Sequence, residues 1–145
     1  MLRIAALGSV RPARLHAGLA AALVAWSAHA QEMLTPDQFL DRANGRTLTF
    51  VDAPSGVLVG VEQFLSRSRS VYARADGTCA YGTVTVEGPE LCFRYDDDPG
   101  RAHCWWPFEA DGSMHVRLAQ PDTGEVQRVD GLSDNPVMCR PQPNV

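Results

Sequence analysis

The sequence contains no lysine, so all 13 of its basic residues are arginines, against 17 acidic residues. Three of these arginines precede residue 30, whereas every acidic residue follows it. The part of the chain after residue 30 therefore carries a formal charge of about −7. Nucleic acids and anionic membrane surfaces bind positively charged patches, so we expect neither of them as a partner. A basic protein remains electrostatically permitted.

Long hydrophobic runs are also missing. The apolar run at 17–26 would form a helix of about 15 Å, half the thickness of a hydrocarbon core of about 30 Å, so no permanent membrane span is predicted. It follows Arg3, Arg11 and Arg14 and ends in Ala28-His29-Ala30, a pattern typical of a signal-peptidase site. We therefore predict a signal peptide over residues 1–30, cleavage after Ala30, and a periplasmic or secreted protein.

Recognisable catalytic and metal-binding motifs are absent as well. The sequence has no C-x-x-C pair of zinc ligands and no G-x-S-x-G nucleophile motif. The acidic run Asp96-Asp97-Asp98 lacks the alternating spacing of a calcium loop and leads into a Pro-Gly turn. We expect no cofactor, no metal and no enzymatic activity. A hydrolase that uses His103 or His115 with an acidic partner is the least favoured alternative.

What the sequence does contain is a set of four cysteines, Cys79, Cys92, Cys104 and Cys139, all after the predicted signal peptide. An even number of cysteines in an exported domain predicts disulfides. If the segments around Cys92 and Cys104 form a hairpin, these two residues lie directly opposite each other, at the distance that a disulfide requires. Cys79 would then pair with Cys139. The two other connectivities remain open.

Residues 31–145 are expected to form a single β domain with one short helix within residues 31–45. Thr35 is a suitable N-cap and Pro36 suits the first helical position. After residue 45, β-branched and aromatic residues alternate with polar ones between regularly spaced turn residues. We predict strands over 47–52, 56–65, 70–75, 78–87, 90–95, 102–108, 114–119 and 125–129. Residues 131–145 are predicted to be an irregular tail, held only by Cys139.

No helical segment separates the predicted strands, so an antiparallel meander is expected. Such a meander can close into a small up-and-down, lipocalin-like barrel or stack as two sheets, and we prefer the barrel. The alternation predicts that Val57, Val59 and Val61 face inward, and that Glu62 faces outward to pair with an arginine of a neighbouring strand. Gly60 among these valines predicts a bend or a bulge.

The most aromatic segment contains Trp105 and Trp106, which must point to opposite sides of a strand. One of them is expected in the core, and the other outside it or lining an opening. The outward tryptophan, with Tyr72 or Tyr81 nearby, is our candidate contact for a ligand or a partner. These four aromatic residues are the predicted contact residues.

Several short motifs lie within residues 40–108. They are Gly45-x-Thr47, Gly60-x-Glu62-x-Phe64, Asp76-Gly77-x-Cys79, Cys92-Phe93-x-Tyr95 and His103-Cys104-Trp105. Together they resemble a family of small exported proteobacterial proteins, a domain of unknown function. The resemblance implies secretion, the Cys92–Cys104 hairpin and an all-β fold, and it implies no activity. The helix followed by Gly-x-Thr is also similar to the opening of lipocalin-like barrels, which have tryptophan where Thr47 stands.

From these features we expect a non-enzymatic binding or interaction module. It would hold a small apolar ligand inside the barrel or contact another envelope protein through its aromatic rim. The alternative is an inhibitor of a lysozyme-type cell-wall hydrolase, because an acidic, disulfide-bonded β domain has the charge that suits a basic lysozyme.

Overall fold

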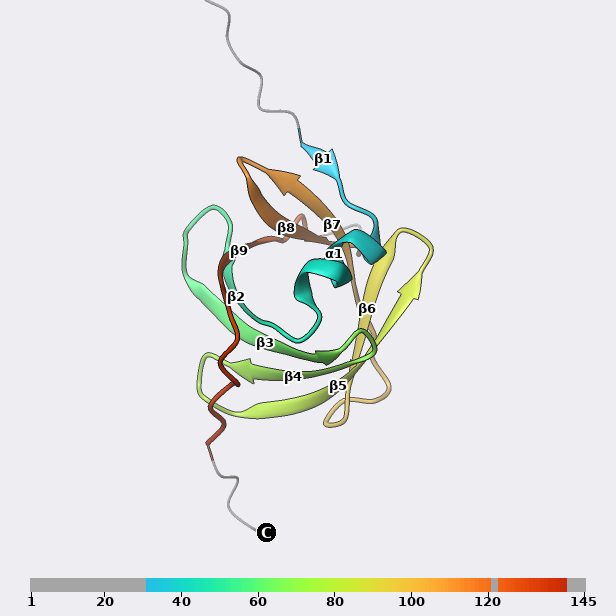
Figure 1. Cartoon of the computed structure of the whole chain (residues 1–145). Coiled ribbons are helices and arrows are strands. Elements are labelled where there is room, and N and C mark those ends of the chain that lie inside the picture. The colour runs from blue at the N-terminus through green and yellow to red at the C-terminus, as the bar shows by residue number, and fades with distance from the viewer. Residues whose placement is uncertain (1–30, 121–122, 141–145) are drawn as a thin grey trace, which may run out of the picture.

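The structure is a computed structural model that describes residues 31–120 and 123–140. The predicted signal peptide and its cleavage site lie outside the described residues. The described elements, in chain order, are β1 (Glu32–Met33), α1 (Pro36–Ala43), β2 (Thr47–Asp52), β3 (Leu58–Ser66), β4 (Arg69–Arg74), β5 (Cys79–Glu87), β6 (Glu90–Tyr95), β7 (His103–Ala110), β8 (Ser113–Leu118) and β9 (Val126–Ser133) (Figure 1).

Strands β2 to β9 form a closed antiparallel barrel in which each strand pairs with the next one along the chain. The last strand, β9, returns to pair with β2 and closes the ring. The predicted up-and-down barrel is therefore confirmed, rather than two stacked sheets. The short strand β1 was not predicted, because two residues are too few to show an alternation; it pairs with β7 through Met33 and Phe108.

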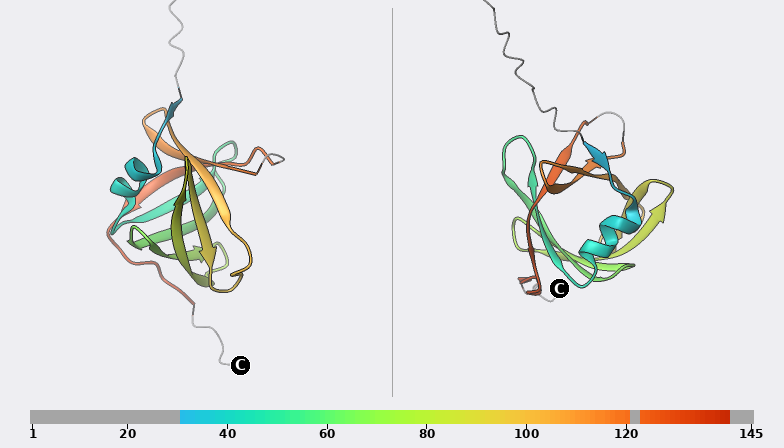
Figure 2. Two further views of the ribbon diagram at one scale, coloured as in Figure 1. Left: turned by 90° about the vertical axis from the view of Figure 1, so that its right-hand side faces the viewer. Right: turned by 45° about the horizontal axis from the view of Figure 1, so that its top comes forward.

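Helix α1 lies across one end of the barrel (Figure 2). A reciprocal capping box between Thr35 and Gln38 begins the helix, with Pro36 in its first turn as predicted. Phe39 and Leu40 are buried in the barrel core. Arg67, in the turn between β3 and β4, forms ion pairs with two aspartates of the helix and holds it at this end. Within residues 31–120 and 123–140, no helix is long and apolar enough to span a membrane.

Val59 packs against the core as predicted, but from Gly60 onward the inner face of β3 is the opposite of the one predicted. Gly60, Glu62 and Phe64 are buried, whereas Val57 is 64% exposed. Successive side chains of a strand alternate between faces, so an error of one residue exchanges the inside with the outside. The pairing register of β2 with β3 shifts next to Gly60, which confirms the predicted bulge. The prediction of an outward Glu62 that pairs with an arginine is wrong.

Two disulfides are present, with the expected connectivity. Cys92 lies directly opposite Cys104, with 4.0 Å between the Cα atoms. Cys79 is bonded to Cys139, and the described residues contain no free cysteine. Two disulfides are typical of a protein in an oxidising, extracellular compartment.

The C-terminal tail begins later than predicted, because β9 continues to pair with β2 as far as Ser133. It is also held by more than Cys139. The Thr47 hydroxyl donates to the Asn135 carbonyl over 2.6 Å, and the Arg140 amide donates to the Gly77 carbonyl over 2.9 Å. Because the tail is not part of a helix or sheet, the Asn135 carbonyl and the Arg140 amide find their hydrogen-bond partners on the barrel wall. The tail is therefore a strap along the outside of the barrel.

Candidate functional site

The barrel encloses a cavity of about 370 Å³, which lies within the range of about 300–1,000 Å³ for ligand pockets. Phe39 of α1 closes it at the helix end. Its apolar wall comes from strands all around the barrel, namely from Phe50, Leu91, Phe93, Trp105, Val116 and Leu118. At the opposite end, it is lined by residues of the β6–β7 and β8–β9 connections, Arg101 and Glu125.

Glu62 is the one buried carboxyl group among the residues that line this cavity. Its side chain is almost fully buried, with 3% of the residue exposed. The Tyr95 hydroxyl donates a hydrogen bond of 3.0 Å to Oε2, whereas Oε1 has no hydrogen-bond partner among the described residues. Burial raises the pKa of Glu62 to about 7, although the neighbouring hydroxyls of Ser70 and Tyr95 oppose part of that rise. The carboxyl group therefore titrates near neutral pH.

Two tyrosines stand beside this carboxyl group. Tyr72 lies directly opposite Glu62 in the β3–β4 ladder, and its ring centroid is 5.5 Å from that of Tyr95. The absence of side chains at Gly60 and Gly82 leaves the space for the two rings. Burial and the nearby Glu62 charge raise the pKa of both tyrosines, so both hydroxyls remain neutral donors. The Tyr72 hydroxyl donates to the Val59 carbonyl over 3.2 Å.

Basic groups lie further along the cavity. Arg74 forms an ion pair of 2.6 Å with Asp97, and its guanidinium lies 5.8 Å from the Tyr72 ring centroid. The His103 ring is 6.0 Å from the Tyr95 ring. Burial, together with the charge of Arg101, lowers the pKa of His103, so its imidazole is neutral at pH 7.

The structure divides the four predicted contact residues between two surfaces. Tyr72 and Trp105 line the cavity. Trp106 instead donates through Nε1 to Glu90 over 3.1 Å, and Tyr81 is 54% exposed on the outside. Sequence reasoning missed Glu62 as a cavity residue. The spacing of Gly60, Glu62 and Phe64 was a usable signal, since residues two apart share a strand face and Phe64 is a large apolar core side chain.

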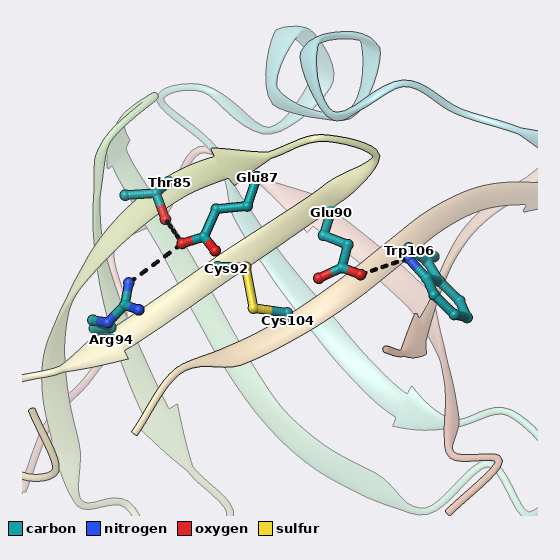
Figure 3. The surroundings of a disulfide bond; sticks show 7 residues. All are labelled: Thr85, Glu87, Glu90, Cys92, Arg94, Cys104 and Trp106. Carbon is teal, nitrogen blue, oxygen red and sulfur yellow. Dashed lines mark hydrogen bonds and ion pairs between the residues drawn. A yellow bond between two sulfur atoms is a disulfide. The ribbon is translucent and has the colours of Figure 1, made fainter. Parts of the chain in front are cut away.

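The surroundings of the Cys92–Cys104 disulfide do not form a metal site (Figure 3). Glu87 comes close to both sulfur atoms, but these sulfurs are bonded to each other and offer no thiolate. The Glu87 carboxylate instead accepts hydrogen bonds from Thr85 and Arg94. This group therefore has a structural role on the barrel wall.

The two histidines do not form the pair with a carboxylate that a hydrolase would need. Nδ1 of His115 lies 2.9 Å from the Ser113 carbonyl, and its ring stacks on Phe108 with 5.1 Å between the centroids. Within the described residues, His103 makes no hydrogen bond to a carboxylate. The geometry gives the hydrolase alternative no support.

No protein-family model, curated protein or solved structure matches this chain. The cavity and its side chains are therefore the basis on which a function has to be argued.

Proposed function

We propose that this protein is an exported, non-enzymatic carrier or sensor that holds a small, mainly apolar ligand inside the barrel. The observation that supports the proposal is the cavity of about 370 Å³, with its aromatic and aliphatic wall and one buried carboxyl group. A pocket of this kind, with few polar groups at fixed positions, is the usual form of a small-molecule site. A core built for stability alone would be expected to fill such a space.

The proposal includes a place for the protein. Both disulfides fit an oxidising compartment, and we propose that residues 1–30 direct the chain to the periplasm or beyond. In the periplasm or outside the cell, a cavity inside the barrel would protect an apolar molecule from water during transport.

The experiment is a titration of the domain from residue 31 with N-phenyl-1-naphthylamine, an uncharged probe whose fluorescence rises in apolar surroundings. We expect saturable binding that Leu118→Trp abolishes, because the larger side chain occupies the cavity that Leu118 lines. Leu65→Trp is the matched control, since Leu65 lies in a strand but is 49% exposed on the outside. This control should bind the probe as the wild type does.

Equal binding by both variants would show that the probe sits on the outer surface and would overturn the proposal. Absence of saturable binding, together with capture of a muramidase from an envelope extract, would favour the cell-wall hydrolase inhibitor instead.

A further inference from the structure

We propose that the ligand is a small organic amine, bound as an ammonium ion at Glu62 with its apolar body against the aromatic wall. This inference rests on the cavity being the ligand site proposed above. It goes further by naming the chemical class of the ligand and the residue that selects it.

The first argument is the missing partner of Glu62. Buried carboxylates in proteins are normally paired with a cation or fully hydrogen-bonded. Among the described residues, no basic side chain forms an ion pair with Glu62, and Oε1 and the hydroxyl of the neighbouring Ser70 are both buried without a hydrogen-bond partner. Arg74, the arginine that lines the same cavity from the neighbouring strand, is already paired with Asp97 at 2.6 Å. A ligand ammonium would supply both the charge and the donor that Glu62 lacks.

The second argument is the aromatic character of the surrounding wall. Tyr72, Phe93, Tyr95 and Trp105 all line the cavity. The face of an aromatic ring attracts a cation, most strongly where water is excluded. The Tyr72 ring already has the Arg74 guanidinium 5.8 Å from its centroid, so one ring of this wall carries such a contact in the structure. A carboxylate next to several aromatic faces is the combination that an organic cation favours.

Other ligand classes fit less well. An alcohol would donate a hydrogen bond to Glu62 but would leave its charge without a partner. A carboxylate ligand would place a second negative charge beside Glu62, which costs free energy in a site of low polarity. Arg101, in the β6–β7 connection, is the lining residue that an acid would bind instead. An amine, an alcohol and a carboxylate ligand should therefore bind with different affinities and depend on different residues of the cavity.

The test compares phenethylamine with two analogues of similar size, the neutral phenethyl alcohol and the anionic phenylacetate. Calorimetric titrations at about pH 8 should show the amine binding at least about tenfold more tightly than either analogue. Glu62→Gln should weaken amine binding at least about tenfold and leave alcohol binding nearly unchanged. Glu90→Gln is the matched control, because Glu90 contacts Trp106 rather than the cavity. It should bind the amine as the wild type does.

The pH dependence gives a second measurement that a merely structural role for Glu62 would not change. Because the ammonium ion binds the ionised carboxylate, its affinity should fall about tenfold per pH unit below the Glu62 pKa of about 7. The other charged or titratable groups that line this cavity are Tyr72, Arg74, Tyr95, Arg101, His103 and Glu125. Of these, His103 also gains a proton in acid, so the slope should persist in His103→Gln and disappear in Glu62→Gln.

Equal affinity for amine and alcohol in the wild type would overturn the inference, and so would no amine binding at all. The wild-type comparison decides this even if Glu62→Gln does not fold. The neutral probe titration with Leu118→Trp is independent of ligand charge. If that probe binds in the cavity but the amine does not, the ligand class is wrong and the proposed binding function stands.

Discussion

The Glu62 carboxyl group and the Tyr95 hydroxyl share a hydrogen bond inside a barrel whose other inner side chains are mainly apolar. One oxygen of the carboxyl group is satisfied, and the other has no partner among the described residues. Burial favours its neutral form, which is why its pKa rises to about 7 from an ordinary value of 4.5. Glu62 therefore costs stability in the empty protein at neutral pH.

A stability measurement should reveal this cost. The pKa of Glu62 is higher in the folded protein than in the unfolded chain, so the protonated carboxyl group favours folding. This contribution to stability is fully present below pH 4.5 and is lost as the pH rises to about 7. Glu62→Gln keeps an oxygen for the Tyr95 hydroxyl but cannot ionise. We expect the stability of this variant relative to the wild type to increase by about 3 kcal/mol between about pH 4.5 and 8. Urea unfolding at several pH values measures this, and a constant difference would contradict it.

At the scale of strands, β3 and β4 pack a large ring against a residue without a side chain. A Cβ atom on Gly60 would collide with the ring of Tyr72 on the adjacent strand, and the ring in turn lines the cavity. The backbone of β3, the position of Tyr72 and the shape of the cavity therefore depend on one another.

We expect Gly60→Ala to destabilise the barrel by about 1–3 kcal/mol, because a packed interior accepts extra atoms only by moving its neighbours. Gly131→Ala is the matched control. Gly131 is also a strand residue, but its nearest neighbour, Thr49, would be 3.8 Å from the new Cβ atom, an ordinary contact. The control should change the free energy of unfolding by less than about 0.5 kcal/mol. A similar loss in both variants would mean that the effect reflects strand glycines in general rather than the contact with Tyr72.

The same pair of strands shows where sequence reasoning succeeds and where it fails. β2 and β6 were predicted to the residue, because their β-branched and aromatic residues are bounded by clear turn signals. The face of β3 from Gly60 onward was inverted because the alternating valines outweighed Gly60 and Glu62, which contact Tyr72 and Tyr95 from other strands. Trp105 was identified as a candidate contact because it lies in an aromatic segment, whereas Glu62, which lines the same cavity, was not identified. Residues brought together by barrel closure leave no local signal.

On the scale of the whole molecule, three features hold the domain together. The pairing of β9 with β2 closes the sheet, helix α1 closes one end, and the two disulfides join segments within and outside the barrel. The domain is small, so its core has a limited capacity to offset the conformational entropy of folding. The disulfides reduce that entropy in the unfolded chain, more so for the longer loop.

Replacing each cysteine pair with alanine should therefore give two different losses. The Cys79–Cys139 bond joins residues 60 positions apart and the Cys92–Cys104 bond joins residues 12 apart. The chain-entropy relation then gives losses of about 4 and about 3 kcal/mol, respectively. Urea unfolding measures both, and the intact mass of the wild type, four hydrogens below its reduced form, verifies that both bonds are formed.

Loss of the longer bond should also expose residues 134–140 to proteases while the neutral probe still binds, because the strap lies outside the cavity. If removing this bond abolishes probe binding in a folded barrel, then the strap supports the cavity, and the separation between the outer wall and the ligand site is wrong.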